Sequence, residues 1–200
     1  MKSADTCEVW NRFVSGDHTA YRNLFTSYYR GLYGYGMKLC SDSVLVEDSI
    51  QNLFITVWER RDQLHHIESP NVYLYVSLRR NLLKAKKKYD KERSYKEEIQ
   101  GDFSIIFGAE EIMIRDEEKQ QQKAELQHAL NQLSNQQKEV LYLHYYNGMS
   151  YGEIEEILSI NRQSVRNHMY RAIQTLRTVL DLDIMRLVIS LMIGILLFTA

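Results

Sequence analysis

The sequence predicts an all-α protein made of two small helical domains, which are joined by a flexible linker and followed by an apolar tail. A single proline among 200 residues, with nine glycines, favours long uninterrupted helices. Apolar residues recur three and four positions apart through most of the chain, as they do along the buried face of a helix. We expect domains at 10–94 and 123–181, a linker at 95–122 and a tail at 182–200.

The first domain shows helical spacing from Asp17 to Tyr95. The dipeptide Ser69-Pro70 indicates the start of a further helix, because Ser can cap free amides and Pro at the first helical position has no amide to lose. One apolar set is assigned to the core and to no site: Val46, Ile50, Leu53, Phe54, Val57 and Trp58.

The segment 95–122 mixes acids and glutamines with a short apolar island at 103–107, flanked by Gly101 and Gly108. Such a composition is typical of a linker. We therefore place the domain boundary in this segment.

The second domain carries two capping boxes, Ser134 to Gln137 and Ser150 to Glu153, and Gly148 between them is expected to be left-handed. An apolar stripe, a turn at 159–161 and a helix running from Asn161 to about Val179 predict a helix-turn-helix. The front of that helix presents a polar face of Arg162, Gln163, Arg166, Asn167, Tyr170 and Arg171.

A helix that reads DNA packs its apolar face on a scaffold and presents a polar N-terminal face to the bases, for which Arg, Gln and Asn are well shaped. No acid lies between Glu156 and Asp181, which favours a phosphate-bearing partner. The alternative is an ordinary amphipathic helix pair with a solvated polar face.

The net charge of -1 conceals two basic patches, at 79–96 and 162–177. Cys7 and Cys40 are too few and too far apart for a disulfide framework or a zinc cluster, and the first ten residues lack a signal-peptide core, so a cytoplasmic protein is expected. The sequence shows no nucleophile-base constellation, phosphate loop or metal cluster. We expect no enzyme activity, no cofactor and no metal.

Two segments resemble a known family. Residues 45–59, with an acidic pair followed by Gln, Phe and Trp, resemble the polymerase-binding helix of sigma factors, and 21–29 is similar to the preceding helix of that family. Residues 133–154 resemble sigma domain four, which reads the minus-35 element. The chain is thus identified over about 10–180 as similar to the extracytoplasmic-function (ECF) group of the sigma-70 family, and its tyrosine-rich style is similar to Bacteroidetes members.

The resemblance implies sigma region 2 at 10–94, for polymerase binding and minus-10 recognition and melting, and sigma region 4 at 123–181, for minus-35 recognition. It implies a factor that directs promoter-specific transcription initiation, with core RNA polymerase, promoter DNA and an anti-sigma factor as partners. One rival is a helix-turn-helix regulator with a signal-sensing N-terminal half. The other is a membrane-anchored interaction protein.

The resemblance also implies site residues. The polymerase-binding set is Glu47, Asp48, Gln51 and Asn52. The loop 64–71 corresponds by position to the one that captures a flipped minus-10 base, and the following helix to the one that contacts the nearby duplex. The minus-10 set is His65, His66, Asn71, Tyr73, Ser77, Arg80, Asn81, Lys84, Lys87 and Lys88. The minus-35 set is the polar face at 162–171. Solvated helix faces and exposed loop histidines are the alternatives.

The tail from Leu187 to Ala200 is almost wholly apolar, which the common family pattern lacks. As a helix it reaches about 21 Å, or about 26 Å from Ile184, against a hydrocarbon core of roughly 30 Å. Two expectations stay open: a tail that packs on the folded domains or on a regulator, and an inner-membrane contact through 184–200.

Overall fold

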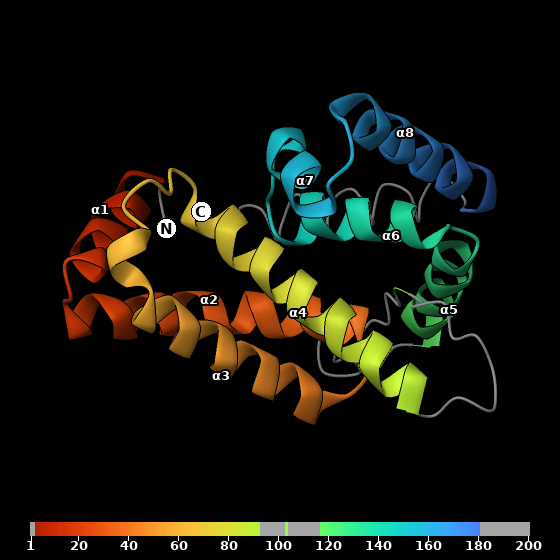
Figure 1. Cartoon of the computed structure of the whole chain (residues 1–200). Coiled ribbons are helices and arrows are strands. Elements are labelled where there is room, and N and C mark those ends of the chain that lie inside the picture. The colour runs from red at the N-terminus through yellow and green to blue at the C-terminus, as the bar shows by residue number, and fades with distance from the viewer. Residues whose placement is uncertain (1–2, 93–102, 104–116, 181–200) are drawn as a thin grey trace. The chain divides into compact units, whose positions relative to one another are not determined.

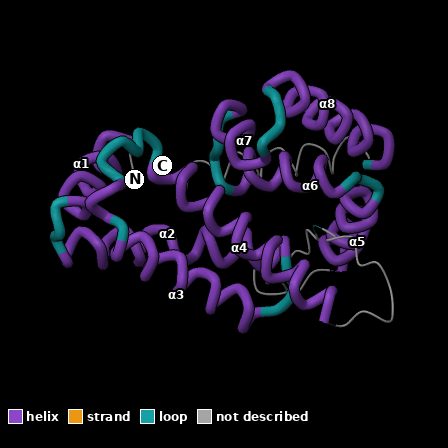
Figure 2. The backbone as a smooth tube through the Cα atoms, viewed as in Figure 1, coloured by secondary structure: helices purple, strands orange, loops and turns teal. Residues whose placement is uncertain are grey.

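The computed structural model describes residues 3–92, 103 and 117–180, and in these ranges the regular secondary structure is helical throughout (Figures 1 and 2). The chain divides into two compact units, 1–102 and 103–200. The all-helical prediction is therefore confirmed. The division falls inside the segment 95–122, most of which lies outside the described residues.

The first unit contains four α-helices and one short 3-10 helix in the described range (Figure 1). The predicted start at Ser69-Pro70 is confirmed, since α4 begins at Pro70. α2 and α3 are joined by a short turn and pack against each other, and α4 packs on both. The elements are α1 Ser3–Val14, α2 His18–Leu39, α3 Ser43–Glu59, η1 Arg61–Gln63 and α4 Pro70–Glu92.

The packing of α2 on α3 depends on a glycine. A Cβ added at Gly36 would lie 2.7 Å from Cγ1 of Val46 and 3.4 Å from Cδ1 of Leu82. Real carbon atoms do not approach so closely, so only glycine lets the two helix backbones come this near. Val46 is fully buried at this contact, together with Ile50, Leu53, Phe54 and Val57 of the same helix.

Trp58 is half-buried rather than fully inside the core, where the sequence placed it. The centroid of the Trp58 ring lies 4.5 Å from that of the His18 ring and 5.1 Å from that of the Tyr21 ring. The Arg61 guanidinium lies 4.7 Å from the same Trp58 centroid. A guanidinium over an indole face is a favourable cation–π contact that leaves the ring edge accessible. Trp58 thus joins α2, α3 and η1 at the rim of the core.

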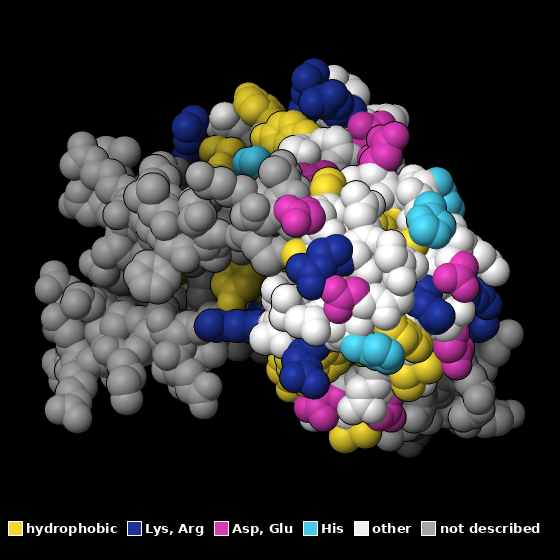
Figure 3. All heavy atoms as spheres, turned by 90° about the vertical axis from the view of Figure 1, so that its left-hand side faces the viewer, with side chains coloured by type: hydrophobic (Ala, Val, Ile, Leu, Met, Phe, Trp, Pro, Cys, Tyr) yellow, Lys and Arg dark blue, Asp and Glu magenta, His cyan; other side chains and the backbone are white. Residues whose placement is uncertain are grey.

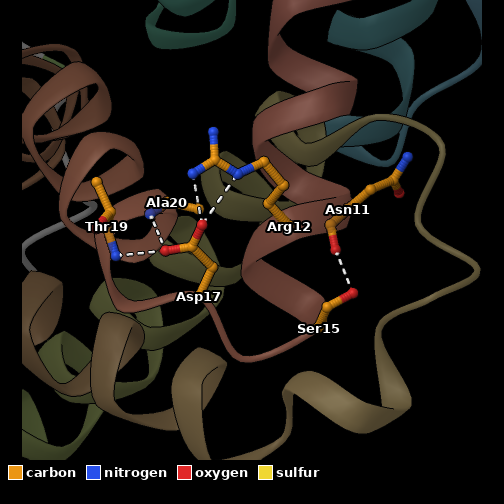
Figure 4. Close-up of polar contacts among 6 residues, drawn as sticks. All are labelled: Asn11, Arg12, Ser15, Asp17, Thr19 and Ala20. Atoms are coloured by element: carbon orange, nitrogen blue, oxygen red, sulfur yellow. Dashed lines mark hydrogen bonds and ion pairs between the residues drawn. The ribbon is translucent and has the colours of Figure 1, made fainter.

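The helix α1 was not expected as an element of its own, although its apolar residues Trp10, Phe13 and Val14 have helical spacing and are buried. It ends where Gly16 adopts a φ of 91°. Asp17 then caps α2, accepting hydrogen bonds through Oδ1 from the amides of Thr19 (2.7 Å) and Ala20 (3.2 Å) (Figure 4). Through Oδ2 it accepts from Arg12 Nε at 2.9 Å.

The second unit contains α5 Glu117–Asn131, α6 Asn135–Leu141, the π-helix η2 Tyr142–Tyr146, α7 Tyr151–Leu158 and α8 Arg162–Val179. Both predicted capping boxes are present. Ser134 Oγ accepts from the Gln137 amide at 3.3 Å, and Ser150 Oγ from the Glu153 amide at 3.3 Å. Gly148 has a φ of 67°, which confirms the left-handed prediction.

None of the helices within 3–92 and 117–180 combines the length and the apolar character that crossing a bilayer requires. Residues 184–200, for which a membrane contact was one expectation, lie outside the described residues.

Asp17 provides a test of the α1–α2 junction. The hydrogen bond from Arg12, followed by the backbone bond from Ala20, holds the pKa of Asp17 below its ordinary value of 3.8. A depressed carboxyl pKa gives stability that is present at neutral pH and lost as pH falls below that value. We expect Asp17→Ala to lower the urea midpoint at neutral pH, and Asp17→Asn, which keeps a capping oxygen, to lower it less.

Tryptophan fluorescence reports this unfolding selectively, because both tryptophans, Trp10 and Trp58, belong to the first unit. The difference in urea midpoint between wild type and Asp17→Asn should decrease only as pH falls below 3.8. A difference in midpoint that is the same at all pH values would show that the ionised pair of Asp17 with Arg12 contributes nothing to stability.

Candidate functional site

The helix-turn-helix is built from α7, a three-residue turn and α8. Ser159 ends α7 in the left-handed conformation, with φ 54° and ψ 43°. Asn161 begins α8, and its Oδ1 accepts from the Ser164 amide at 2.8 Å. The predicted turn at 159–161 and the cap at Asn161 are thus confirmed, and together they fix the angle at which α8 leaves α7.

The two faces of α8 divide as the spacing predicted. Val165, Met169, Ala172 and Leu176 are buried. On the opposite face every residue of the predicted minus-35 set is exposed: Arg162, Gln163, Arg166, Asn167, Tyr170 and Arg171. Tyr170 is a large aromatic residue left 65% exposed, whereas the aromatic residues of a core are covered.

Two of these exposed side chains are linked. Gln163 Nε2 donates to Asn167 Oδ1 at 3.1 Å, one helical turn further along. The bond orients the Gln163 amide, because one of its two N–H groups is held by Asn167. The Gln163 carbonyl oxygen and the second N–H can still accept and donate a hydrogen bond.

The helix-turn-helix is held from behind by the π-helix. His144 Nδ1 lies 2.7 Å from the carbonyl oxygen of Met149 and must donate, because a carbonyl only accepts. The His144 ring packs 4.8 Å from Tyr145 and 5.0 Å from Tyr151. Burial raises the pKa of the Tyr145 hydroxyl above its usual value. Sequence reasoning missed this wider turn, since a π-turn leaves no capping pattern.

On α3 the whole predicted polymerase-binding set is exposed: Glu47, Asp48, Gln51 and Asn52. Val44 and Ile55 are exposed as well, at 66% and 51%. Val44, Asp48, Gln51 and Ile55 follow one another at intervals of four, three and four residues. Their four side chains therefore lie along one stripe of the helix. The sequence reasoning overlooked these two apolar residues, although the same spacing carries the signal.

The loop before α4 is attached to α1. Trp10 Nε1 donates to the Leu64 carbonyl at 3.4 Å, and Cys7 Sγ lies 4.0 Å from the Glu68 carbonyl. Between these two points His65 and His66 are exposed. The loop segment that carries His65 and His66 is therefore attached to α1 on both sides of the two histidines. On the side of α1 viewed in Figure 3, His side chains lie among charges of both signs.

Apart from Asn71, the predicted minus-10 residues of α4 follow one side of the helix by their spacing. Asn71, in the first turn, is half-buried, and so are Tyr73 and Ser77. The Tyr73 ring lies 6.1 Å from that of Trp10, which ties it to α1. Further along the helix four residues of the set are exposed, namely Arg80, Asn81, Lys84 and Lys87, while the side chain of Lys88 lies outside the described residues.

The opposite side of α4 is apolar, because Leu74, Leu78 and Leu82 are buried against the rest of the unit. The outward side thus combines an anchored aromatic residue near the loop with basic side chains further along. Within the described ranges no three His, Cys, Asp or Glu residues form a group that could hold a metal ion.

The cap of α8 provides a test of the helix-turn-helix. We expect Asn161→Ala to destabilise the second unit by about 1 kcal/mol, because the Ser164 amide loses its acceptor, and Asn161→Ser to cost much less. Far-UV circular dichroism during urea unfolding reports both units, whereas tryptophan fluorescence reports the first alone. A shift of the fluorescence transition would contradict a local role for Asn161.

Comparison with known families gives two matches in chain order. Residues 24–92 match Sigma-70 region 2, and residues 123–176 match Sigma-70, region 4. The first match contains α3, the loop and α4, and the second contains the helix-turn-helix. The two matched segments therefore contain all three predicted sets of site residues.

Curated relatives match along most of the chain. The ECF RNA polymerase sigma factor SigK of Mycobacterium tuberculosis (strain ATCC 25618 / H37Rv) is 19% identical over 184 residues, which cover 90% of this chain and 96% of the relative. SigK of Mycobacterium ulcerans (strain Agy99) is 20% identical over 181 residues, with the same coverage of 90% and 96%.

Solved structures show the same fold. CnrH, in complex with the cytosolic domain of CnrY, is 18% identical, with 88% of this chain and 96% of that chain covered and a TM-score of 0.56. RpoE from Bartonella quintana, in complex with the anti-sigma factor NepR, is 20% identical, with 82% and 98% covered and a TM-score of 0.59.

Regions 2 and 4 follow each other in this chain, and the curated relative SigK matches the chain along 96% of its own length. The chain belongs to the sigma-70 family: it is an RNA polymerase sigma factor of the ECF group, which binds core polymerase and promoter DNA to initiate transcription and is not an enzyme.

Proposed function

We propose that this sigma factor divides its work among three surfaces: the outward stripe of α3 docks on core polymerase, the loop 64–71 with α4 holds the minus-10 element, and α8 reads the minus-35 element. The observation that carries the proposal is the division of α8, whose apolar face is buried while six polar or aromatic side chains at its front are exposed. A major groove admits such a helix, front end first.

The α3 stripe suits a protein partner rather than DNA. It combines the polar residues Asp48 and Gln51 with the exposed apolar residues Val44 and Ile55, and it contains no basic side chain. Carboxylates repel phosphates, whereas apolar side chains between polar ones are typical of a docking surface that excludes water. A merely solvated face would gain nothing from two exposed β-branched residues.

The loop and α4 suit a melted strand. Flipping a base out of the stack costs a few kcal/mol, so a capture site needs side chains held in place to stack on it or bond to it. His65 and His66 stand between two points fixed to α1. Beyond them Arg80, Lys84 and Lys87 follow one side of α4, where they can track phosphates of the adjoining strand.

Run-off transcription with purified core polymerase tests the division of labour. We expect Asp48→Ala and Gln51→Ala to weaken binding of core polymerase, because each removes a polar contact from the α3 stripe. We expect Arg166→Ala to weaken promoter selection while polymerase binding stays intact. The matched controls are Glu8→Ala on α1 and Arg177→Ala at the far end of α8, and both residues are exposed.

Equal losses of polymerase binding in the α3 and α8 variants would contradict separate surfaces. If the wild-type protein never redirects transcription start sites, the result would favour the alternative function, a helix-turn-helix regulator. Liposome binding without promoter-specific transcription would favour the membrane-anchored alternative.

The linked amides predict a base preference. An amide that offers one acceptor and one donor matches adenine N6 and N7, and Gln163 keeps such an edge while Asn167 holds it in place. We expect Gln163→Ala to lose about 1–3 kcal/mol of discrimination at a single A·T pair of the minus-35 element, and Asn167→Ala to lose less. Initiation on promoters varied one base pair at a time measures this; a uniform loss across all sequences would show phosphate contact only.

The remaining proposals rest on the family. The solved structures of CnrH and RpoE are complexes with the cytosolic domain of CnrY and with the anti-sigma factor NepR, so we propose an anti-sigma partner for this chain as well. It acts in the cytoplasm, where core polymerase is found. Its 14 tyrosines support a Bacteroidetes-type member. The linker at 95–122 joins the two regions, and the tail at 184–200 contacts the folded domains, a regulator or the inner membrane.

A further inference from the structure

The loop that carries His65 and His66 begins with a closed turn. The amide of Ile67 donates to the carbonyl oxygen of Leu64 at 3.2 Å, so residues 64–67 form a β-turn with the two histidines at its corner. Leu64 is buried and Ile67 is half-buried. The two histidines are exposed. The ends of the turn are therefore covered by the protein, and its corner faces solvent.

A second donor reaches the same carbonyl oxygen from α1. The indole Nε1 of Trp10 donates to the Leu64 oxygen at 3.4 Å, and this bond is buried. A backbone carbonyl has two lone pairs, so the Leu64 oxygen can accept from Ile67 and from Trp10 together. The oxygen that closes the turn is thereby tied to a residue 54 positions earlier in the chain.

The Trp10 ring also contacts the far end of the loop. It meets the ring of Tyr73, near the start of α4, edge-on at 64°, with centroids 6.1 Å apart. α1 packs on both η1 and α4, the elements that flank the loop (Figure 1). Three residues before Trp10 on the same side of α1, Cys7 Sγ lies 4.0 Å from the Glu68 carbonyl oxygen. One side of α1 thus supports the loop at its start, its middle and its end.

Trp10 can act on DNA only through the groups that it holds. Its side chain is 2% exposed, too little to touch a base or a phosphate. The groups that it contacts are the Leu64 carbonyl and the Tyr73 ring. α1 also precedes the segment 24–92 that matches Sigma-70 region 2, so this support of the loop comes from outside the matched segment.

We propose that Trp10 is a positioning residue for minus-10 recognition: its indole N–H holds the Leu64 carbonyl so that the turn presents His65 and His66 to the flipped base. The proposal rests on the proposed assignment of the loop 64–71 to the minus-10 element. Without the N–H the turn samples other arrangements, and base capture weakens as the competent fraction falls. The loss of one hydrogen bond shifts such an equilibrium roughly three- to tenfold.

The test is Trp10→Phe in the full-length protein bound to core polymerase. Phenylalanine keeps a ring near Tyr73 but lacks the N–H donor. The probe is promoter DNA with an unpaired minus-10 segment, whose bases are varied one at a time. We expect the preferred sequence to bind roughly three- to tenfold more weakly. Discrimination should fall at the same base position as in His65→Ala or His66→Ala, and polymerase binding should stay unchanged.

Val14→Ala is the matched control. Val14 is buried one turn further along α1 and takes part in neither bond to the loop, and its truncation removes a comparable amount of side chain. It should lower the urea midpoint of the first unit without changing base discrimination. Equal loss of discrimination in Val14→Ala and Trp10→Phe would show a merely structural role and overturn the proposal.

A double-mutant cycle tests whether Trp10 acts through the histidines. Once His65 and His66 are both replaced by Ala, Trp10→Phe should weaken DNA binding no further, because no capturing side chain remains to be positioned. Full additivity of the two losses would overturn the proposal.

Amide hydrogen exchange in the free protein separates the turn from the function assigned to it. The Ile67 amide should exchange faster in Trp10→Phe than in wild type, by a larger factor than the amides of α3, because the substitution loosens the turn. Unchanged exchange of Ile67 would overturn the proposal. If Ile67 exchanges faster but replacement of both histidines leaves DNA binding unchanged, Trp10 holds the turn as described, and the assignment of the loop to the minus-10 element is what fails.

Discussion

The close approach of α2 and α3 at Gly36 is the constraint on which the outward face of α3 depends. Because nothing larger than hydrogen fits between Gly36 and Val46, the side of α3 that carries Val46 is committed to the interior. The opposite side of the same helix, with Asp48 and Gln51, is then obliged to face outward. A helix that rotated by a third of a turn would bury these polar groups and expose the core.

The two regions reach the same arrangement, an exposed face opposite a buried apolar one, by different physical means. In region 4 the ends of the helices are set locally, by Ser134, Ser150 and Asn161, each of which bonds to an amide three residues away. In region 2 the loop before α4 is set at long range, by the Trp10 side chain on the Leu64 carbonyl. Local caps survive sequence change nearby, whereas the long-range bond depends on the whole fold of α1.

This difference explains how much the sequence could predict. The starts of α6, α7 and α8 follow from capping patterns and apolar spacing, which are relations between neighbours. The attachment of α1 to the loop joins residues 54 positions apart, and no local pattern encodes it. The half-exposure of Trp58 depends on where Arg61 lies in space. For the same reason the site residues of α8 could be placed on their face in advance, while the support of His65 and His66 could not.

The outward face of α8 is separate from the residues that hold the helix in position. Its scaffold is Val165, Met169, Ala172 and Leu176 on the inside and Asn161 at the start, none of which belongs to the exposed set that we propose to read DNA. Substitutions among the exposed residues therefore leave folding largely untouched. With the role in promoter selection that we propose for α8, a gene duplicate of this protein can acquire a new regulon through a few surface changes, each of which leaves the protein folded.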